Sequence, residues 1–479
     1  MVVWRTIGEN MKLDYKRTVL VGFAFLLISA FWQAYDAIIP LILTNRFGLL
    51  QSVSGAIMSV DNVLAVFLLP LFGAISDKHR GRFGRRTPFV LFGTVAAVVA
   101  FAVLTVIDNV QLSRIIAAGI ADMSAEGLSD EAFAELVREK TIEVTLANPW
   151  ILVGFIATLL VVLIAMATFR SPAVALMPDV TPRPLRSKGN AVINLLGASG
   201  AISVLTLGMI FGTSGDKYMK YTGYVIAVCA LMLLALIVFM LTVKEKKWAE
   251  EADKIEAEGE RTPETCTDSE PKKKKLTRPE LKSLLLILAS VALWYIGYNS
   301  ITSKYSVYAE NVLHFDFNLT LIVAQAAAIV SFIPVGIISS RFGRKKTILA
   351  GVLMLTAAFF IGNFVTAESP ELLMYPIFAL AGIGWATINV NSFPMVVELS
   401  RGGDVGKYTG YYYTASMAAQ IVAPILSGVL YDLISMRAVF FAFGTVFVAL
   451  SFLTMLFVKH GDTKPQKKGS VIESFDVGD

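Results

Sequence analysis

Long uncharged stretches constrain the fold of this chain more than any other feature of its sequence. Residues 223–243 and 438–458 each contain 21 residues without a charge, and about 20 apolar residues are enough for a helix to span a bilayer. Only 16% of the 479 residues are charged, whereas a soluble domain is about one-quarter charged. The sequence therefore excludes a soluble enzyme, a secreted disulfide scaffold and a disordered chain, and it predicts an all-α membrane protein with many spans.

Twelve apolar stretches can be delimited, and lysine and arginine fall mainly on alternate loops between them. Because positively charged loops stay in the cytoplasm, this alternation predicts an integral, multi-pass protein of the plasma (cell) membrane with both termini cytoplasmic. The even number of spans agrees with that topology. The predicted spans are 18–44, 52–75, 88–108, 150–178, 189–212, 221–243, 282–308, 318–340, 347–366, 372–397, 406–432 and 437–459.

A short basic motif occurs twice. Arg-Phe-Gly-Arg-Arg-Thr begins at Arg82, and Arg-Phe-Gly-Arg-Lys-Lys-Thr begins 259 residues later at Arg341. A weaker correspondence pairs Lys188 with Lys407, 219 residues apart. The offsets differ by 40, about the length of an insertion found only in the first half. Two six-helix halves in the same orientation explain this pattern. Such an arrangement resembles that of a major facilitator transporter.

Two long polar segments interrupt the spans. In the external one, Ser129 followed by two acids predicts a helix start. The cytoplasmic one ends in four lysines, Lys272–Lys275, and is predicted to be a solvated tether; a short helix lying on the membrane is the alternative. The predicted segments are the cytoplasmic amino terminus 1–17, the half 18–243 with its extracytoplasmic helical insertion 109–148, the cytoplasmic linker 244–281, the half 282–459 and the cytoplasmic tail 460–479.

The chain lacks the patterns of several other functions. Cys229 and Cys266 lie at different depths, so neither a disulfide nor a metal site is expected. No phosphate-cradling glycine loop is present, and no catalytic motif is found. We therefore expect no enzyme activity, no cofactor, no binding of nucleic acid and no obligatory protein partner. The expected partners are a small-molecule substrate and the lipid bilayer.

The loop from Gly73 to Pro88 resembles the major facilitator signature between spans two and three. Its Arg-Phe-Gly-Arg-Arg-x-Pro form is similar to the sucrose-transporter branch and to the glycoside–pentoside–hexuronide cation symporters, as are the segments 172–179 and 410–420. This resemblance implies a twelve-helix sugar transporter. The two acids that hold sodium in melibiose-type symporters fall here on Ala65 and Leu69, so the resemblance does not extend to a sodium site.

Three ionisable residues are predicted within the spans: Asp36, Asp61 and Arg170. Such residues are functional candidates because they are costly in the membrane. The three histidines lie in loops or tails, so a moving proton would be carried by a carboxylate. We expect Asp61 and Asp36 to couple transport to protons, with Arg170 as their charge partner; a permanent salt bridge between spans is the alternative.

Polar and aromatic residues recur at helical spacing on several spans. Amides and hydroxyls suit the hydroxyl groups of a sugar, and aromatic faces suit its C–H face. The alternatives are polar contacts between helices and an interfacial aromatic belt. The candidate substrate-binding residues are Trp32, Gln33, Asn190, Asn194, Tyr295, Tyr298, Asn299, Trp385, Asn389, Asn391 and Gln420.

The repeated basic loops are predicted to form a conformational latch, with Asp77 pairing to arginines of neighbouring helices when the cytoplasmic side is closed. The alternative is that their charges only set the topology. The candidate latch residues are Gly73, Asp77, Arg82, Gly84, Arg85, Arg86, Arg341, Gly343 and Arg344.

Together these features predict secondary active transport, with proton symport of a sugar or disaccharide-like glycoside by alternating access. Sodium is disfavoured as the coupling ion, and no metal site is expected. The transport alternative is a sodium-coupled symporter or an exporter of another small solute. The alternative from a different class is a non-transporting membrane receptor or scaffold.

Overall fold

A computed structural model describes residues 13–125, 127–182, 185–260, 277–399 and 405–460. Within these residues, twelve helices are long and apolar enough to cross a membrane, and the all-helical fold that the sequence predicts is confirmed. The spanning helices are α2 (Tyr15–Leu41, extended by the π-helix η1, Ile42–Arg46), α3 (Gln51–Lys78), α4 (Thr87–Ala117), α6 (Pro149–Val180), α7 (Arg186–Phe211), α8 (Thr222–Thr242), α10 (Arg278–Thr302), α12 (Phe317–Phe342), α13 (Arg344–Gly362), α14 (Met374–Val397), α15 (Val405–Leu433) and α16 (Met436–Leu456).

Shorter elements connect the spans. The insertion contains η2 (Ile120–Asp122) and α5 (Asp130–Ala147), the linker contains α9 (Glu245–Glu260), and α10 is followed by α11 (Tyr305–Tyr308) and the π-helix η4 (Ala309–Leu313). A short turn, η5 (Glu371–Leu373), precedes α14. Helix α5 begins where the sequence predicts, because the Ser129 side chain accepts a hydrogen bond from the Ala132 backbone N–H at 3.3 Å.

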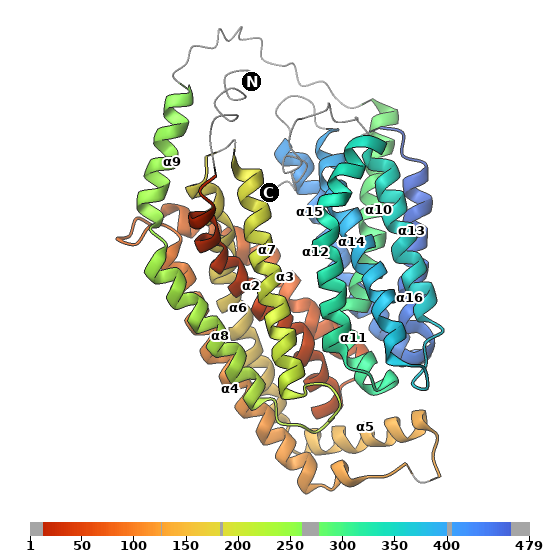
Figure 1. The fold of residues 1–479 in the computed structure, drawn as a ribbon. Coiled ribbons are helices and arrows are strands. Elements are labelled where there is room, and N and C mark those ends of the chain that lie inside the picture. The colour runs from red at the N-terminus through yellow and green to blue at the C-terminus, as the bar shows by residue number, and fades with distance from the viewer. Residues whose placement is uncertain (1–12, 126, 183–184, 261–276, 400–404, 461–479) are drawn as a thin grey trace.

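Helix packing repeats between the two halves, which lie side by side in Figure 1. In the first half α2 packs on α7 and α8, α6 on α3 and α4, and α4 on α8. The corresponding pairs of the second half are α10 with α15 and α16, α14 with α12 and α13, and α13 with α16. The structure thus has two equivalent six-helix bundles, as the repeated motif predicts. Contacts between the halves run mainly from α3 to α15 and from α7 to α12.

The two ends of the bundle differ. We call the end with α5 and Asp432 the cap end, and the end with Arg86, Arg344 and α9 the linker end (Figure 1). At the cap end the carboxylate of Asp432 accepts hydrogen bonds from the backbone N–H groups of Gln51 and Ser52, both at 2.8 Å. These bonds join α15 to the start of α3, so the halves are held together at the cap end.

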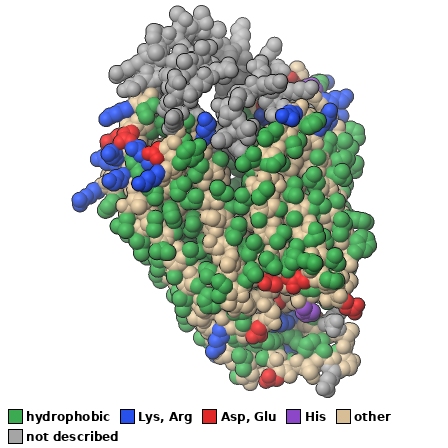
Figure 2. Space-filling view, viewed as in Figure 1, with side chains coloured by type: hydrophobic (Ala, Val, Ile, Leu, Met, Phe, Trp, Pro, Cys, Tyr) green, Lys and Arg blue, Asp and Glu red, His purple; other side chains and the backbone are tan. Residues whose placement is uncertain are grey.

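The visible face carries a broad band of hydrophobic side chains, as expected for helices that face lipid (Figure 2). Lysine and arginine gather toward the linker end of this face, and acidic side chains toward the cap end. Large apolar side chains are exposed on both halves, including Phe67, Phe92, Val330 and Leu241. The surface therefore matches that of a protein embedded in a bilayer.

Two expectations need correction. The third span does not end at residue 108: α4 continues to Ala117, and Asp108 is fully buried within it. The first part of the linker is not a solvated tether, because Trp248 and Ala252 of α9 are buried and α9 packs on α6. The lysine run Lys272–Lys275 lies outside the described residues.

Candidate functional site

Helices α2, α3 and α6 bring the three predicted intramembrane charges into one region. Asp61 lies within electrostatic range of both Arg170 and Asp36. The Asp61 carboxylate accepts hydrogen bonds from the backbone and side-chain amides of Asn62, at 2.6 and 2.7 Å. The charges are therefore neighbours, although no direct ion pair joins Asp61 to Arg170 among the described contacts.

Aromatic side chains border these charges. The guanidinium of Arg170 lies 5.5 Å from the centre of the Trp32 ring, a cation–π geometry. Trp32 contacts Tyr35 edge-to-face at 5.4 Å. The Trp32 indole N–H and the Tyr35 hydroxyl find no hydrogen-bond partner among the described residues. Two buried donors without a hydrogen-bond partner among the described residues therefore lie close to Arg170 and Asp61.

The second half contributes a stacked aromatic pair. The rings of Tyr298 on α10 and Trp385 on α14 lie 3.8 Å apart and nearly parallel, and Tyr295 meets Trp385 edge-to-face at 5.3 Å. Tyr298 is also within electrostatic range of Asp36. The structure thus brings the predicted residues of the second half close to those of the first.

The remaining predicted residues differ in their surroundings. Asn194 is exposed and donates to the Asn190 side chain at 3.2 Å, while Gln33 and Asn389 are partly exposed. Asn299 and Gln420 are partly exposed and donate to carbonyls one turn earlier on their own helices. Asn391 is different. It is buried, its amide oxygen accepts from Ser339 and its nitrogen donates to the Thr387 carbonyl. Asn391 therefore joins α12 to α14, and we leave it out of the proposed lining.

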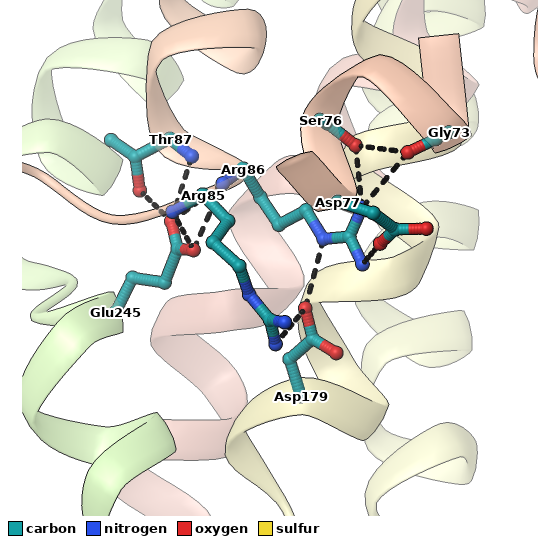
Figure 3. A network of polar contacts seen from close by, with 8 residues as sticks. All are labelled: Gly73, Ser76, Asp77, Arg85, Arg86, Thr87, Asp179 and Glu245. Atoms are coloured by element: carbon teal, nitrogen blue, oxygen red, sulfur yellow. Dashed lines mark hydrogen bonds and ion pairs between the residues drawn. The ribbon is translucent and has the colours of Figure 1, made fainter. Parts of the chain in front are cut away.

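At the linker end, Arg86 lies at the centre of a polar network (Figure 3). It is 5% exposed, and its guanidinium contacts Asp179 at 2.8 Å, Asp77 at 2.5 Å and the Ser76 hydroxyl at 2.5 Å. Burial opposes the charge of Arg86, but Asp179 and Asp77 outweigh burial and raise the pKa of the guanidinium above its ordinary value. Arg86 is therefore held as a cation that joins α3, α4 and α6.

A carboxylate from the linker completes this network. Glu245, the first residue of α9, accepts hydrogen bonds from the backbone N–H groups of Arg86 and Thr87, at 2.9 and 2.7 Å, and from the Thr87 hydroxyl at 2.7 Å (Figure 3). An acid at this position satisfies free N–H groups at the start of α4 and complements its dipole. Gly84 has a φ of 118°, and a Cβ there would collide with the Glu245 carboxylate, which explains the glycine.

The second half repeats part of the arrangement. Arg85 pairs with Asp179 at 3.3 Å in the first half, and Arg344 pairs with Glu398 at 2.5 Å in the second. The spacings from Arg85 to Arg344 and from Asp179 to Glu398 equal the two sequence offsets, 259 and 219. Arg82 and Arg341 are exposed. The Arg85–Asp179 and Arg344–Glu398 pairs each lie within one half, so neither of them joins the two halves.

Sequence reasoning missed a buried charged cluster at the cap end. Arg46, expected to be a loop residue, is 1% exposed and lies 3.5 Å from Asp108. Glu310 and Lys304, also buried, bond to residues of the other half. Position 304 fell inside the predicted seventh span, so an intramembrane charge there could have been noticed from the sequence.

A comparison with known protein families decides the identity of the fold. The model described as the Major Facilitator Superfamily matches residues 21–340 and 317–475. The chain belongs to the Major Facilitator Superfamily. It is thus a multi-pass membrane transporter, and the two equivalent bundles are the two halves typical of this superfamily.

Individual relatives agree with the superfamily and differ in substrate. An uncharacterised MFS-type transporter of Methanocaldococcus jannaschii is 23% identical over 457 residues, covering 94% of this chain and 97% of the relative. A D-xylose–proton symporter structure has a TM-score of 0.59 at 15% identity, covering 94% and 99% of the two chains. A POT family transporter bound to 5-aminolevulinic acid has a TM-score of 0.62 at 12% identity, covering 92% and 94%. Similarity at this level establishes the fold, and the sucrose-transporter assignment stays a prediction.

Proposed function

We propose that this transporter carries a sugar or glycoside by alternating access, in symport with protons. One observation carries the proposal: Asp61, Arg170 and Trp32 meet within the spans, and the Trp32 indole N–H is left without a protein partner. A substrate hydroxyl is a suitable acceptor for that donor, and the Trp32 face suits the C–H face of a sugar ring. The proposal is supported by a structural neighbour that is described as a D-xylose–proton symporter.

In this proposal Asp61 and Asp36 take up the proton and Arg170 links it to the substrate. Arg170 attracts the ionised form of Asp61 when the two are close. A sugar that hydrogen-bonds to Arg170 weakens that attraction, so substrate and proton binding become thermodynamically coupled. The positions that hold sodium in melibiose-type symporters are Ala65 and Leu69 here, which favours protons over sodium.

The lining would come from both halves. Trp32, Gln33, Asn190 and Asn194 belong to the first half, and Tyr295, Tyr298, Asn299, Trp385, Asn389 and Gln420 to the second. A site shared by the halves is exposed alternately to each side when they rock against each other.

Charge distribution supports an orientation. The linker end carries Arg82, Arg85 and Arg86 in the first half and Arg341 and Arg344 in the second. By the positive-inside rule we propose that the linker end is cytoplasmic, with both termini, and that the protein lies in the cell membrane.

Counterflow in proteoliposomes tests the function. Vesicles loaded with a panel of unlabelled mono- and disaccharides are diluted into trace labelled sugar, while a trapped dye reports internal pH. We expect one sugar class to drive uptake of label, and a gradient of that sugar to move protons with it. If sugar uptake occurs without proton movement and requires sodium, the coupling ion is wrong. If no sugar is exchanged, the substrate class is wrong.

A further inference from the structure

Glu310 is a buried carboxyl group at the cap-end contact between the halves. It lies in η4 of the second half and is 7% exposed. The side-chain amide of Asn45, in η1 of the first half, donates to its Oε1 at 3.3 Å, and Asn311 donates to the Asn45 oxygen at 2.8 Å. Glu310 is thus buried by the contact between the halves.

The second oxygen of this carboxyl, Oε2, has no hydrogen-bond partner among the described residues. The nearby cation Arg46 is engaged elsewhere: its guanidinium donates to the carbonyls of Lys217 and Met219, at 2.5 and 2.6 Å, and lies near Asp108. An ionised carboxylate with an unpaired buried oxygen is costly. A protonated carboxyl is accommodated better, because it carries no net charge.

The charges around Glu310 come from three elements. Burial raises the pKa of Glu310 to about 7; Arg46 of η1 and Lys217 of the α7–α8 loop lower it, and Asp216 of the same loop raises it. Tyr221 is also within electrostatic range of Glu310. Asp108 of α4 pairs with Arg46. Burial therefore outweighs the two cations.

We propose that Glu310 is a proton-binding site whose occupancy is linked to the contact between the halves at the cap end. Glu310 binds a proton from water when the cap end closes and returns it when the cap end opens and the carboxyl is hydrated. The inference requires alternating access but neither the sugar substrate nor coupling at Asp61.

The direction of the pH effect follows from the two states. When closed, the carboxyl holds its proton up to pH about 7; when open and hydrated, a glutamate releases it near about 4.3. At a pH between these two pKa values, closing of the cap end takes up a proton, so acid on the cap side favours the closed state. The contribution of Glu310 to the stability of the closed state is lost as the pH rises through 7.

Lys304 acts in the opposite direction. Its ammonium donates to the Ser54 hydroxyl of the first half at 2.6 Å, and burial lowers its pKa to about 7 although Asp432 opposes this shift. Closing therefore releases a proton from Lys304 as Glu310 takes one up. The effects of Lys304 and Glu310 on the pH dependence of closure therefore partly cancel in the wild-type protein. The role of Glu310 must be measured by comparison with a variant in which only residue 310 no longer titrates.

The test uses the full-length protein in nanodiscs without substrate. Cys229 and Cys266 are replaced by alanine, and nitroxides are attached to cysteines introduced at the exposed positions Ala117 and Ala367, one in each half near the cap end. Distance distributions then report the closed-to-open ratio. From pH 5.5 to 7.5 we expect this ratio to fall about 20-fold more in the wild type than in Glu310→Gln, from the two proton affinities above.

Matched variants identify the source of the effect. Glu368→Gln, at an exposed cap-end position, should behave as the wild type. The difference between wild type and Glu310→Gln should persist in an Asp61→Asn background, which separates this inference from the proposed function. Equal pH responses of wild type and Glu310→Gln would overturn the proposal, as would loss of the difference in Asp61→Asn.

If Glu310→Gln does not fold, Asn45→Ala provides a second test. This variant keeps the Glu310 carboxyl but removes the hydrogen bond that Asn45 donates to it. That hydrogen bond stabilises the ionised form of the carboxyl, so its loss favours the protonated form. We expect the protonated-carboxyl infrared band of the closed protein to titrate at a higher pH in Asn45→Ala than in the wild type. An unchanged midpoint, or no carboxyl band that titrates near pH 7, would contradict the proposal.

Discussion

The carboxylate of Glu245 binds the start of α4, where it accepts the backbone N–H and the hydroxyl of Thr87, both at 2.7 Å. Residues 87 and 245 belong to different segments, since Thr87 begins the third span and Glu245 begins the linker helix after the sixth. The linker is therefore attached to the first half directly beside Arg86.

Replacing Glu245 by alanine should destabilise the protein. The change removes several hydrogen bonds to backbone N–H groups and leaves these groups buried, at a cost of about 1–3 kcal/mol. A lower midpoint of thermal unfolding in detergent would show this. Glu250→Ala, on an exposed position of the same helix, should have almost no effect; equal effects of both variants would contradict the role given to Glu245.

Asp179 should matter more than Asp77 for the stability of the Arg86 network. The Asp179 side chain is 18% exposed and contacts both Arg85 and Arg86, whereas Asp77 is 58% exposed. An exposed ion pair contributes about 0–1 kcal/mol, and losing one partner of a buried pair costs several times more. Thermal unfolding of Asp179→Asn and Asp77→Asn compares the two, and a larger loss in Asp77→Asn would refute the ranking.

Gly55→Ala should favour opening of the cap end. A Cβ at this position of α3 would collide with the Pro424 carbonyl of α15, so the close approach of these helices would be lost. Crowding of this kind costs about 1–3 kcal/mol, which corresponds to a shift of about 5- to 150-fold toward the open state. Modification of cap-end cysteines by a membrane-impermeant reagent measures the shift. Gly410→Ala, on α15 with open space around it, is the control and should leave modification unchanged.

Trp385→Ala should weaken binding of the transported sugar. The substitution removes an aromatic face and the partner of Tyr298, and we expect affinity to fall by about 10- to 100-fold. Trp385→Phe should retain more affinity because it keeps a ring. Trp150→Ala, at a side chain 78% exposed, controls for loss of a tryptophan. Equilibrium binding by titration calorimetry gives all three values, and unchanged affinity in Trp385→Ala would remove that residue from the lining.

The fold could be predicted from the sequence because its strongest signals are local. Apolar stretches of bilayer length and the repeated motif at Arg82 and Arg341 are both visible without three-dimensional information, and the structure confirms the helices and the two equivalent bundles. The prediction that the third span ends at residue 108 is wrong, because it assumes that a charge such as Asp108 ends the span. Here Arg46, from a distant segment, compensates that charge.

Contacts between segments that are distant in the sequence are harder to predict from the sequence alone. The three intramembrane charges were identified from hydropathy, but the approach of Arg170 to Trp32 depends on how α6 packs against α2. Glu245 looks like one acid among many in a polar linker, and Glu310 like a loop residue. Their roles depend on burial by partners far away in the sequence, which composition and periodicity do not report.

Proton-driven accumulation in proteoliposomes that contain Asp61→Asn tests the central claim most directly. With an imposed proton gradient, the wild type should concentrate the transported sugar above its external level. Asp61→Asn should only equilibrate it, while exchange of labelled for unlabelled sugar continues because exchange needs no net proton movement. Wild-type accumulation by Asp61→Asn would contradict proton coupling at Asp61.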